Sequence, residues 1–205
     1  MSDPSIYIVD DDPAVRDSLA VLLEVEGYRT ETFDSATQFL EAWSHDLRGG
    51  LLLDVRMPVM DGLELLEKLK ERGNQLPVVI MTGHGDVPLA VRAMKAGAMD
   101  FIEKPLTDTL LLNAVRSMIA YEEEQHERLQ EQQEVHHRLA ELTPREQDVL
   151  EKLVIGQPNK VIAHELGISI RTVEVHRGRV MEKMGAKSLS HLVRMASVDP
   201  GISEW

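Results

Sequence analysis

The sequence contains no cysteine among its 205 residues, which excludes disulfide frameworks and thiolate chemistry and is compatible with a reducing cytoplasm. No segment resembles a secretory signal peptide, because Asp3 and the acidic run 10–12 interrupt every apolar stretch near the N-terminus. No apolar run approaches the length of a membrane span. We therefore expect a cytoplasmic protein without a membrane partner.

Positive charge is scarce in the first two thirds of the chain. Residues 1–121 carry 11 Lys and Arg against 20 Asp and Glu, a net charge of −9, and residues 122–141 carry a net charge of −5. Residues 142–205 carry 9 basic and 8 acidic residues, a net charge of +1. The total of −13 therefore argues against a nucleic-acid partner for the first part only. This asymmetry divides the chain into three predicted segments with these boundaries.

Residues 1–121 alternate strand and helix patterns five times. The apolar runs are short, as in the buried strands of a parallel sheet, and lie at 6–9, 51–53, 78–81 and 101–102, with a weaker candidate at 30–33. Amphipathic helical patterns separate them, and the first begins at Pro13 after a capping aspartate. The alternation predicts an α/β domain with a five-stranded, parallel, doubly wound, flavodoxin-like sheet.

A helical pattern continues from about residue 107 to residue 142. Its second half, residues 122–141, is the predicted linker. A coiled-coil seam needs apolar residues seven apart, and the positions tested do not supply them: Ile119, His126, Gln133 and Ala140. We therefore favour a solvated helical linker over a coiled coil.

Residues 142–205 show only helical patterns. Thr143, Pro144 and Glu146 form the signature of a capping box at the start of the first helix. A short helix at 159–166, a three-residue turn at 167–169 and a longer helix at 170–184 predict a helix-turn-helix unit. The expected domain is all-α with four helices.

Charged and polar side chains follow four of the predicted strands: Asp10, Asp11, Asp12, Asp54, Thr82 and Lys104. The carboxyl ends of parallel strands share one edge of the sheet, so these side chains should converge there. Neighbouring carboxylates repel one another unless a cation lies between them, and hard oxygen ligands suit Mg²⁺, or Mn²⁺ in its place. Asp54 is the best candidate for a nucleophile towards phosphorus, with Lys104 balancing the charge and Thr82 donating a hydrogen bond. The Lys104–Pro105 peptide is a candidate for the cis form.

The order and spacing of five motifs resemble the receiver domains of two-component response regulators: Ile8-Val9-Asp10-Asp11-Asp12, Asp54-Val55-Arg56-Met57-Pro58, Asp61-Gly62, Thr82-Gly83-His84-Gly85 and Phe101-Ile102-Glu103-Lys104-Pro105. The resemblance implies that Asp54 accepts a phosphoryl group from a kinase phosphohistidine. It also implies that Asp10, Asp11, Asp54 and the main-chain oxygen of Arg56 bind the metal, and that Thr82 and the switch residue Phe101 reorganise. Asp12 is a third acid beside the usual pair, which leaves open which of the three hold the ion.

The helix at 170–184 has an inward stripe formed by Val173, His176, Val180 and Met184, so we interpret His176 as a packed core residue. Its other side could enter a DNA major groove. The candidate DNA-binding residues are Lys160, Arg171, Thr172, Glu174, Val175, Arg177, Arg179 and Lys183. The motifs 142–146, 159–163 and 169–176 resemble the LuxR/GerE-type DNA-binding domain.

A receiver followed by this output domain resembles the NarL/FixJ family, and within it the activators of nitrogen-fixation genes. The resemblance implies a phosphorylation-activated transcriptional regulator that dimerises through its receiver. Its implied partners are a FixL-type sensor histidine kinase, which senses oxygen through haem, together with double-stranded DNA, RNA polymerase and a second copy of the chain. Such a protein is not a conventional enzyme, although it would phosphorylate itself from small donors and slowly lose the phosphoryl group. Masking of the output helix and simple inactivity of the monomer both remain open for the unphosphorylated state.

Two other functions are weighed against this prediction. A magnesium-dependent phosphohydrolase with an aspartate nucleophile needs an acidic residue two positions after Asp54, where this chain has Arg56. A receiver that acts only through protein contacts would not need the C-terminal helix-turn-helix. Both features favour the regulator.

Overall fold

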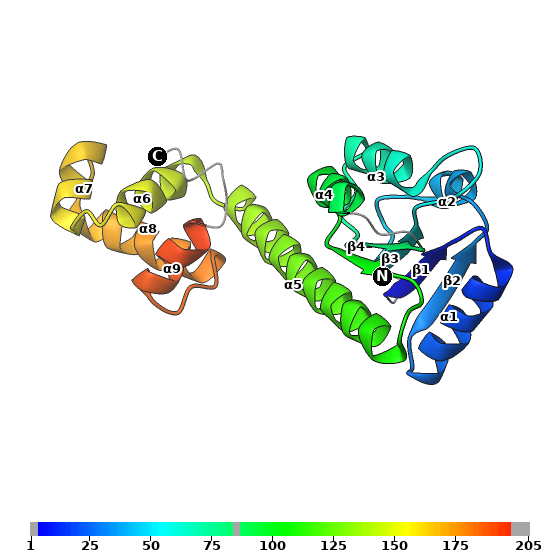
Figure 1. The fold of residues 1–205 in the computed structure, drawn as a ribbon. Helices are drawn as coiled ribbons and strands as arrows, with labels where there is room; N and C mark the ends of the chain where they lie inside the picture. The colour runs from blue at the N-terminus through cyan, green and yellow to red at the C-terminus, as the bar shows by residue number, and fades with distance from the viewer. Residues whose placement is uncertain (1–3, 84–86, 198–205) are drawn as a thin grey trace. The chain divides into compact units, whose positions relative to one another are not determined.

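The computed structural model describes residues 4–83 and 87–197 (Figure 1). The chain divides into two compact units, Met1–Gln125 and His126–Trp205. Each unit is described by itself.

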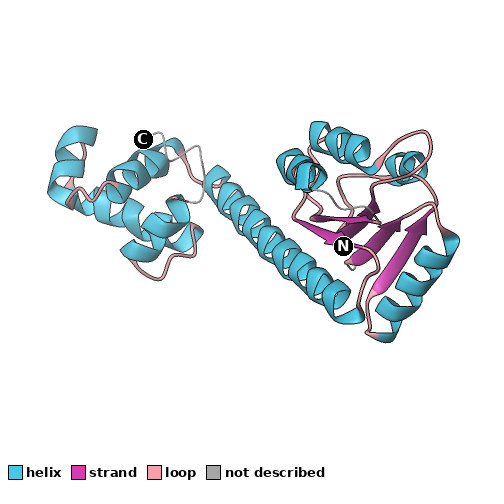
Figure 2. Ribbon diagram, in the orientation of Figure 1, coloured by secondary structure: helices cyan, strands magenta, loops and turns pink. Residues whose placement is uncertain are grey.

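The first unit contains a parallel five-stranded sheet in the order β2-β1-β3-β4-β5 (Figure 2). Its strands are β1 (Ser5–Val9), β2 (Arg29–Phe33), β3 (Gly49–Asp54), β4 (Val78–Thr82) and β5 (Asp100–Glu103). The connecting helices are α1 (Pro13–Val25), α2 (Ala36–Ala42), α3 (Gly62–Glu71) and α4 (Val87–Ala96), and α5 (Asp108–Ala140) follows β5. The predicted doubly wound α/β fold is confirmed.

Side chains alternate between two apolar cores along the central strands. Ile8 and Leu52 lie in the core that α1 and α5 cover. Tyr7 and Leu53 lie in the core on the other face, which α2, α3 and α4 cover (Figure 1). A strand that is buried on both faces reads as a continuous apolar run, which explains why these runs were visible in the sequence.

Close packing brings α3 to the end of β3. Asp61 caps α3 by accepting a hydrogen bond from the Glu64 amide over 2.8 Å. Gly62 follows, and a Cβ atom at this position would collide with the main-chain oxygen of Asp54. The glycine therefore lets the helix start directly beside the strand end.

The helix α5 is continuous through the predicted linker, but it is not solvated throughout. Glu122 is only 7% exposed and forms a two-fold ion pair with Arg48, with N–O distances of 2.8 and 3.1 Å. Val135 is 2% exposed and belongs to the core of the second unit. The predicted solvated linker is thus helical, but it is buried at these two positions.

The second unit is helical in its described part. After the end of α5 it contains α6 (Pro144–Val154), α7 (Asn159–Leu166), α8 (Ile170–Lys183) and α9 (Leu189–Ala196). The capping box at Thr143 and Glu146 is present. The turn between α7 and α8 passes through Gly167 with a φ of 67°, a conformation that favours glycine. The predicted all-α helix-turn-helix fold is confirmed.

Candidate functional site

Lys104 joins two buried carboxylates at the carboxyl edge of the sheet. Its Nζ lies 2.6 Å from Asp10 Oδ2 and 2.6 Å from Asp54 Oδ1. Asp10 is 1% exposed and Asp54 is 5% exposed. The structure therefore brings together three of the predicted residues: Asp10 directly follows β1, Asp54 ends β3 and Lys104 directly follows β5.

The surroundings of Asp54 disfavour its charged form. Burial raises the pKa of Asp54, although the hydrogen bond and the charge of Lys104 act in the opposite direction. Burial also opposes the charge of Lys104, but its hydrogen bonds to Asp10 and Asp54 outweigh burial and raise its pKa. The ammonium group therefore stays charged, and a further cation beside Asp54 would be favourable.

Main-chain amides hold both carboxylates, and the Asp12 amide donates to Asp10 Oδ1 over 3.0 Å. The Arg56 amide donates to Asp54 Oδ2 over 2.6 Å, so both oxygens of Asp54 accept a hydrogen bond. Arg16, on α1, donates from Nη1 to the main-chain oxygen of Asp10 over 2.7 Å. Sequence reasoning missed Arg16, whose position in an amphipathic helix gave no signal for this contact.

The donor set fits a hydrated magnesium ion. Carboxylate oxygens of Asp10 and Asp54 approach one cationic group, and Mg²⁺ needs only one or two carboxylates beside water. Within residues 4–83 and 87–197, no group of three or more His, Asp or Glu side chains is placed to hold an ion. Asp11 is exposed and lines the adjacent hollow. Asp12 instead caps α1 by accepting a hydrogen bond from the Ala14 amide over 2.8 Å, a role that competes with metal binding.

Thr82 and Phe101 lie on the two strands next to the acidic cluster. Thr82 ends β4, is fully buried, and its main-chain oxygen accepts a hydrogen bond from the Lys104 amide over 2.7 Å. Phe101 is half-buried and packs against the core under α4. The Lys104–Pro105 peptide is cis, as considered from the sequence. His84 and Gly85 of the predicted loop motif lie outside the described residues.

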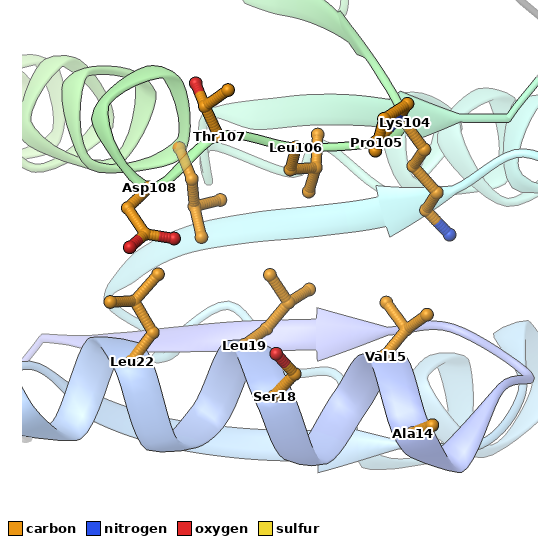
Figure 3. Close-up of a pocket in the computed structure, with 11 residues that line it drawn as sticks. Ala14, Val15, Ser18, Leu19, Leu22, Lys104, Pro105, Leu106, Thr107 and Asp108 are labelled. Carbon is orange, nitrogen blue, oxygen red and sulfur yellow. The ribbon is translucent and has the colours of Figure 1, made fainter.

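Two hollows open beside the cluster. One, of about 680 Å³, is lined by Asp11, Arg56, Asp61 and Arg92 among others. The other, of about 320 Å³, lies between α1 and the segment 104–108 (Figure 3). Val15, Leu19 and Leu22 of α1 point into it from one side, and the segment 104–108 lines the other side, with Lys104 at one end. The second hollow is thus a mostly apolar groove that ends at Lys104, the partner of Asp54.

The loop after β3 contains a tight turn that the sequence did not reveal. Val59 has a φ of 71°, is 99% exposed, and is spanned by a hydrogen bond from the Met60 amide to the Pro58 oxygen over 2.8 Å. A γ-turn with a positive φ is rare and strained, above all for a β-branched residue. The strain lies five residues from Asp54.

Helix α8 presents an exposed face in the second unit. Its exposed candidates are Arg171, Glu174, Val175 and Arg179, and Lys160 on α7 is exposed as well. Val175 is 49% exposed, which leaves its side chain accessible for an apolar contact. Val173 and Val180 are fully buried on the opposite side. His176 is half-buried, and its Nδ1 is buried without a hydrogen-bond partner.

Three other candidate DNA contacts are engaged within the unit. Lys183 Nζ lies 2.7 Å from Glu146 Oε2 and 3.0 Å from the main-chain oxygen of Glu141. Arg177 donates to Asn159 Oδ1 over 3.3 Å, and the Thr172 hydroxyl lies 2.8 Å from that of Ser169. The internal ion pair of Lys183 competes with the predicted phosphate contact, because its long side chain turns back towards α6.

The sequence matches the family described as "Response regulator receiver domain" over residues 6–116. The chain belongs to the response-regulator family. Residues 140–196 match "Bacterial regulatory proteins, luxR family", so this response regulator joins a receiver to a LuxR-type DNA-binding unit. The predicted class, a phosphorylation-dependent regulator of transcription rather than a conventional enzyme, is that of the family.

Relatives of this regulator resemble it over nearly its full length. It is 52% identical to transcriptional regulatory protein FixJ of Azorhizobium caulinodans, with 93% of this chain and 90% of that protein covered. Its structure resembles that of response regulator StyR with a TM-score of 0.85 at 42% identity, covering 96% and 99% of the two chains. Full-length FixJ from B. japonicum gives a TM-score of 0.59 at 46% identity, with both chains fully covered. In the described part of the regulator, no helix has both the length and the apolar composition of a membrane span.

Proposed function

We propose that Asp54 accepts a phosphoryl group from a sensor histidine kinase and that this modification switches on DNA binding. The observation that carries the proposal is the placement of Lys104 between Asp10 and Asp54. In the reaction, an Asp54 carboxylate oxygen forms a bond to phosphorus while the P–N bond of the kinase phosphohistidine breaks. The departing imidazole nitrogen takes up a proton. The Lys104 ammonium balances charge on the transferred group.

A magnesium ion, or Mn²⁺ in its place, would be held by Asp10, Asp11, Asp54 and the main-chain oxygen of Arg56. The ion would supply neutralisation of the carboxylates and of the phosphoryl oxygens. Asp12 remains engaged as the cap of α1. Thr82 would donate its hydroxyl proton to a phosphoryl oxygen, and the half-buried Phe101 would move further into the core beside α4.

The groove between α1 and the segment 104–108 supports docking of the kinase. It is mostly apolar and ends at Lys104, so an apolar helix placed in it would bring a phosphohistidine to Asp54. Ser18→Arg should fill the groove and slow transfer from the kinase at least tenfold. Reaction with a small acyl phosphate should be unchanged in this variant. Equal slowing of both reactions would rule out this docking site.

Self-association is supported by the exposed face of α4. Val87, Val91 and Met94 lie at helical spacing and are 77%, 46% and 50% exposed. The edge strand β5 next to α4 carries Asp100 and Glu103, whereas α4 carries Arg92. Two copies related by a two-fold axis could therefore match basic α4 residues to acidic β5 residues around an apolar centre.

Helix α8 would enter the DNA major groove. Arg171 and Arg179, with Lys160, would contact phosphates, while Glu174 and Val175 would reach base edges. The resemblance to FixJ supports the further proposal that the genes controlled are those of nitrogen fixation and that the regulator activates them through RNA polymerase. The domain boundaries at 121 and 141 remain a proposal, since α5 contributes to both units.

The test is the molecular mass in solution, measured by light scattering with Mg²⁺ and an acyl phosphate. We expect a monomer-to-dimer shift that requires both additions and is lost in Asp54→Asn. Dimerisation of that variant on addition of the donor would refute the role of Asp54. A phosphorylated protein, confirmed by mass spectrometry, that stays monomeric would refute phosphorylation-gated pairing.

A further inference from the structure

The last turns of α5 hold the C-terminal end of α8. Arg138 donates from Nη1 to the main-chain oxygen of Met184, the C-cap of α8, over 2.7 Å. A cation is favourable at this place because the last carbonyl groups of a helix carry negative partial charge. Glu134, one turn earlier in α5, accepts a hydrogen bond from Arg138 Nε over 2.7 Å. The guanidinium group is therefore directed at the end of α8 by its own helix.

The residue after Met184 is adapted to this contact. Gly185 has a φ of 64°, the left-handed conformation that commonly ends helices. A Cβ atom on Gly185 would collide with the guanidinium group of Arg138. The glycine therefore both ends α8 and leaves room for Arg138.

A second contact runs in the opposite direction. Lys183, the last residue of α8, donates to the main-chain oxygen of Glu141, just after α5, over 3.0 Å. The same ammonium group pairs with the buried Glu146 of α6. Val135, on α5, is inserted into the core that α8 helps to form. The end of α8 is thus held by side chains from both sides of the α5–α6 junction.

We propose that Arg138 is a positioning residue for DNA recognition. It fixes the C-terminal end of α8, so that the exposed face of this helix keeps the direction needed to reach base edges. Residues 134–139 then work as part of the DNA-binding unit, although they precede the segment 140–196 that matches the luxR family. The inference rests on the proposed function, in which α8 reads DNA. Base contacts depend on geometry more strictly than phosphate contacts, so loss of Arg138 should reduce specificity more than general affinity.

The experiment uses the phosphorylated full-length chain and two DNA duplexes. One duplex is selected from a random pool by the unaltered protein, and the other has the same composition in shuffled order. Arg138→Met should weaken binding to the selected duplex by roughly fivefold to twentyfold, the effect of misplacing one base contact. Binding to the shuffled duplex should change less than about twofold. Circular dichroism verifies that each variant is folded at the temperature of the assay.

Two further variants test whether the cation and its direction cause the effect. Arg138→Lys keeps a cation near the Met184 oxygen and should recover part of the specificity that Arg138→Met loses. Glu134→Gln weakens the hold on the guanidinium group and should reduce specificity less than Arg138→Met does. The matched control is Arg128→Met, which removes the same charge from an exposed position of α5 and should leave the ratio of the two affinities unchanged.

The outcomes separate this inference from the proposed function. If Arg138→Met weakens binding to both duplexes equally, or to neither, Arg138 does not position α8. If Arg179→Ala and Glu174→Ala also leave both affinities unchanged, α8 is not the DNA-reading helix. If those two variants weaken binding while Arg138→Met keeps the ratio, only the positioning role fails.

Discussion

The ion pair between Lys183 and Glu146 predicts that Lys183 contributes more to the stability of the second unit than to DNA binding. Its two charged atoms lie 2.7 Å apart, and Glu146 is 2% exposed. The hydrogen bond from Lys183, followed by that from the Thr143 amide, lowers the pKa of Glu146 from 4.5 to about 2. The perturbation is Lys183→Met, which keeps the length of the side chain and removes its charge.

The expected loss of stability follows from these values. A pKa change from 4.5 to about 2 corresponds to roughly 3 kcal/mol, which the contacts with Lys183 and Thr143 share. The side chain of Lys183 is 33% exposed, so water screens the pair, and we expect Lys183→Met to cost about 1–2 kcal/mol at pH 7. Because the pKa of Glu146 is lowered by folding, this contribution is present above pH 4.5 and is lost as the pH falls towards 2. The variant should therefore lose the part of the acid sensitivity that this pair causes.

The assay is urea unfolding of the full-length chain, with the transition of the second unit followed by NMR signals of its buried methyl groups. Glu146→Gln keeps the capping box, because glutamine still accepts a hydrogen bond from the Thr143 amide. The double variant completes a cycle whose coupling energy should be about 1–2 kcal/mol. Unchanged stability of Lys183→Met, together with weaker and less salt-dependent DNA binding, would refute the reasoning and restore the phosphate contact.

Three further predictions concern the first unit. Burial raises the pKa of Asp54, so the folded state loses stability as the pH rises through that pKa. Asp54→Asn should therefore raise the thermal midpoint, measured by calorimetry at pH 7.5 without Mg²⁺, by a few degrees. A lower midpoint would contradict this. Val59→Gly should relieve about 1–2 kcal/mol of backbone strain and cost about 0.5–1 kcal/mol of chain entropy. The free energy of unfolding in urea should therefore rise slightly, and a decrease would show that the turn is unstrained. Arg48→Met leaves Glu122 buried and unpaired, and should cost about 2–3 kcal/mol in the same assay, whereas the exposed control Arg116→Met should cost less than about 0.5.

The sequence was sufficient for the fold and for the acidic cluster because both depend on regular rules. Strands that are buried on both faces read as apolar runs, and parallel strands share a carboxyl edge, so Asp10, Asp54 and Lys104 could be placed together before any coordinates. Their separation of up to 94 residues along the chain did not matter, since the edge collects them.

The contacts that the sequence could not predict depend on long side chains and main-chain atoms. Helical spacing put Lys183 on the exposed face, but it does not say where a flexible four-carbon stem directs its ammonium group. Arg138 binds a carbonyl oxygen, a group that every residue has, and so leaves no pattern. Glu122 looked like one of several solvated glutamates, and its partner Arg48 lies 74 residues earlier. The positive φ of Val59 runs against the preference of its own residue type.

The burial along α5 also indicates where such regulators can be recombined. Between Glu122, which belongs to the first unit through Arg48, and Val135, which belongs to the second core, every residue is exposed or only partly covered. A chimera joined within 123–133 would keep both sets of buried contacts, whereas a joint at either end of the matched families, at residue 116 or 140, would separate Glu122 or Arg138 from its partner. Exchange of inputs and outputs between such genes should therefore succeed most often when the crossover falls in this short glutamate- and glutamine-rich stretch.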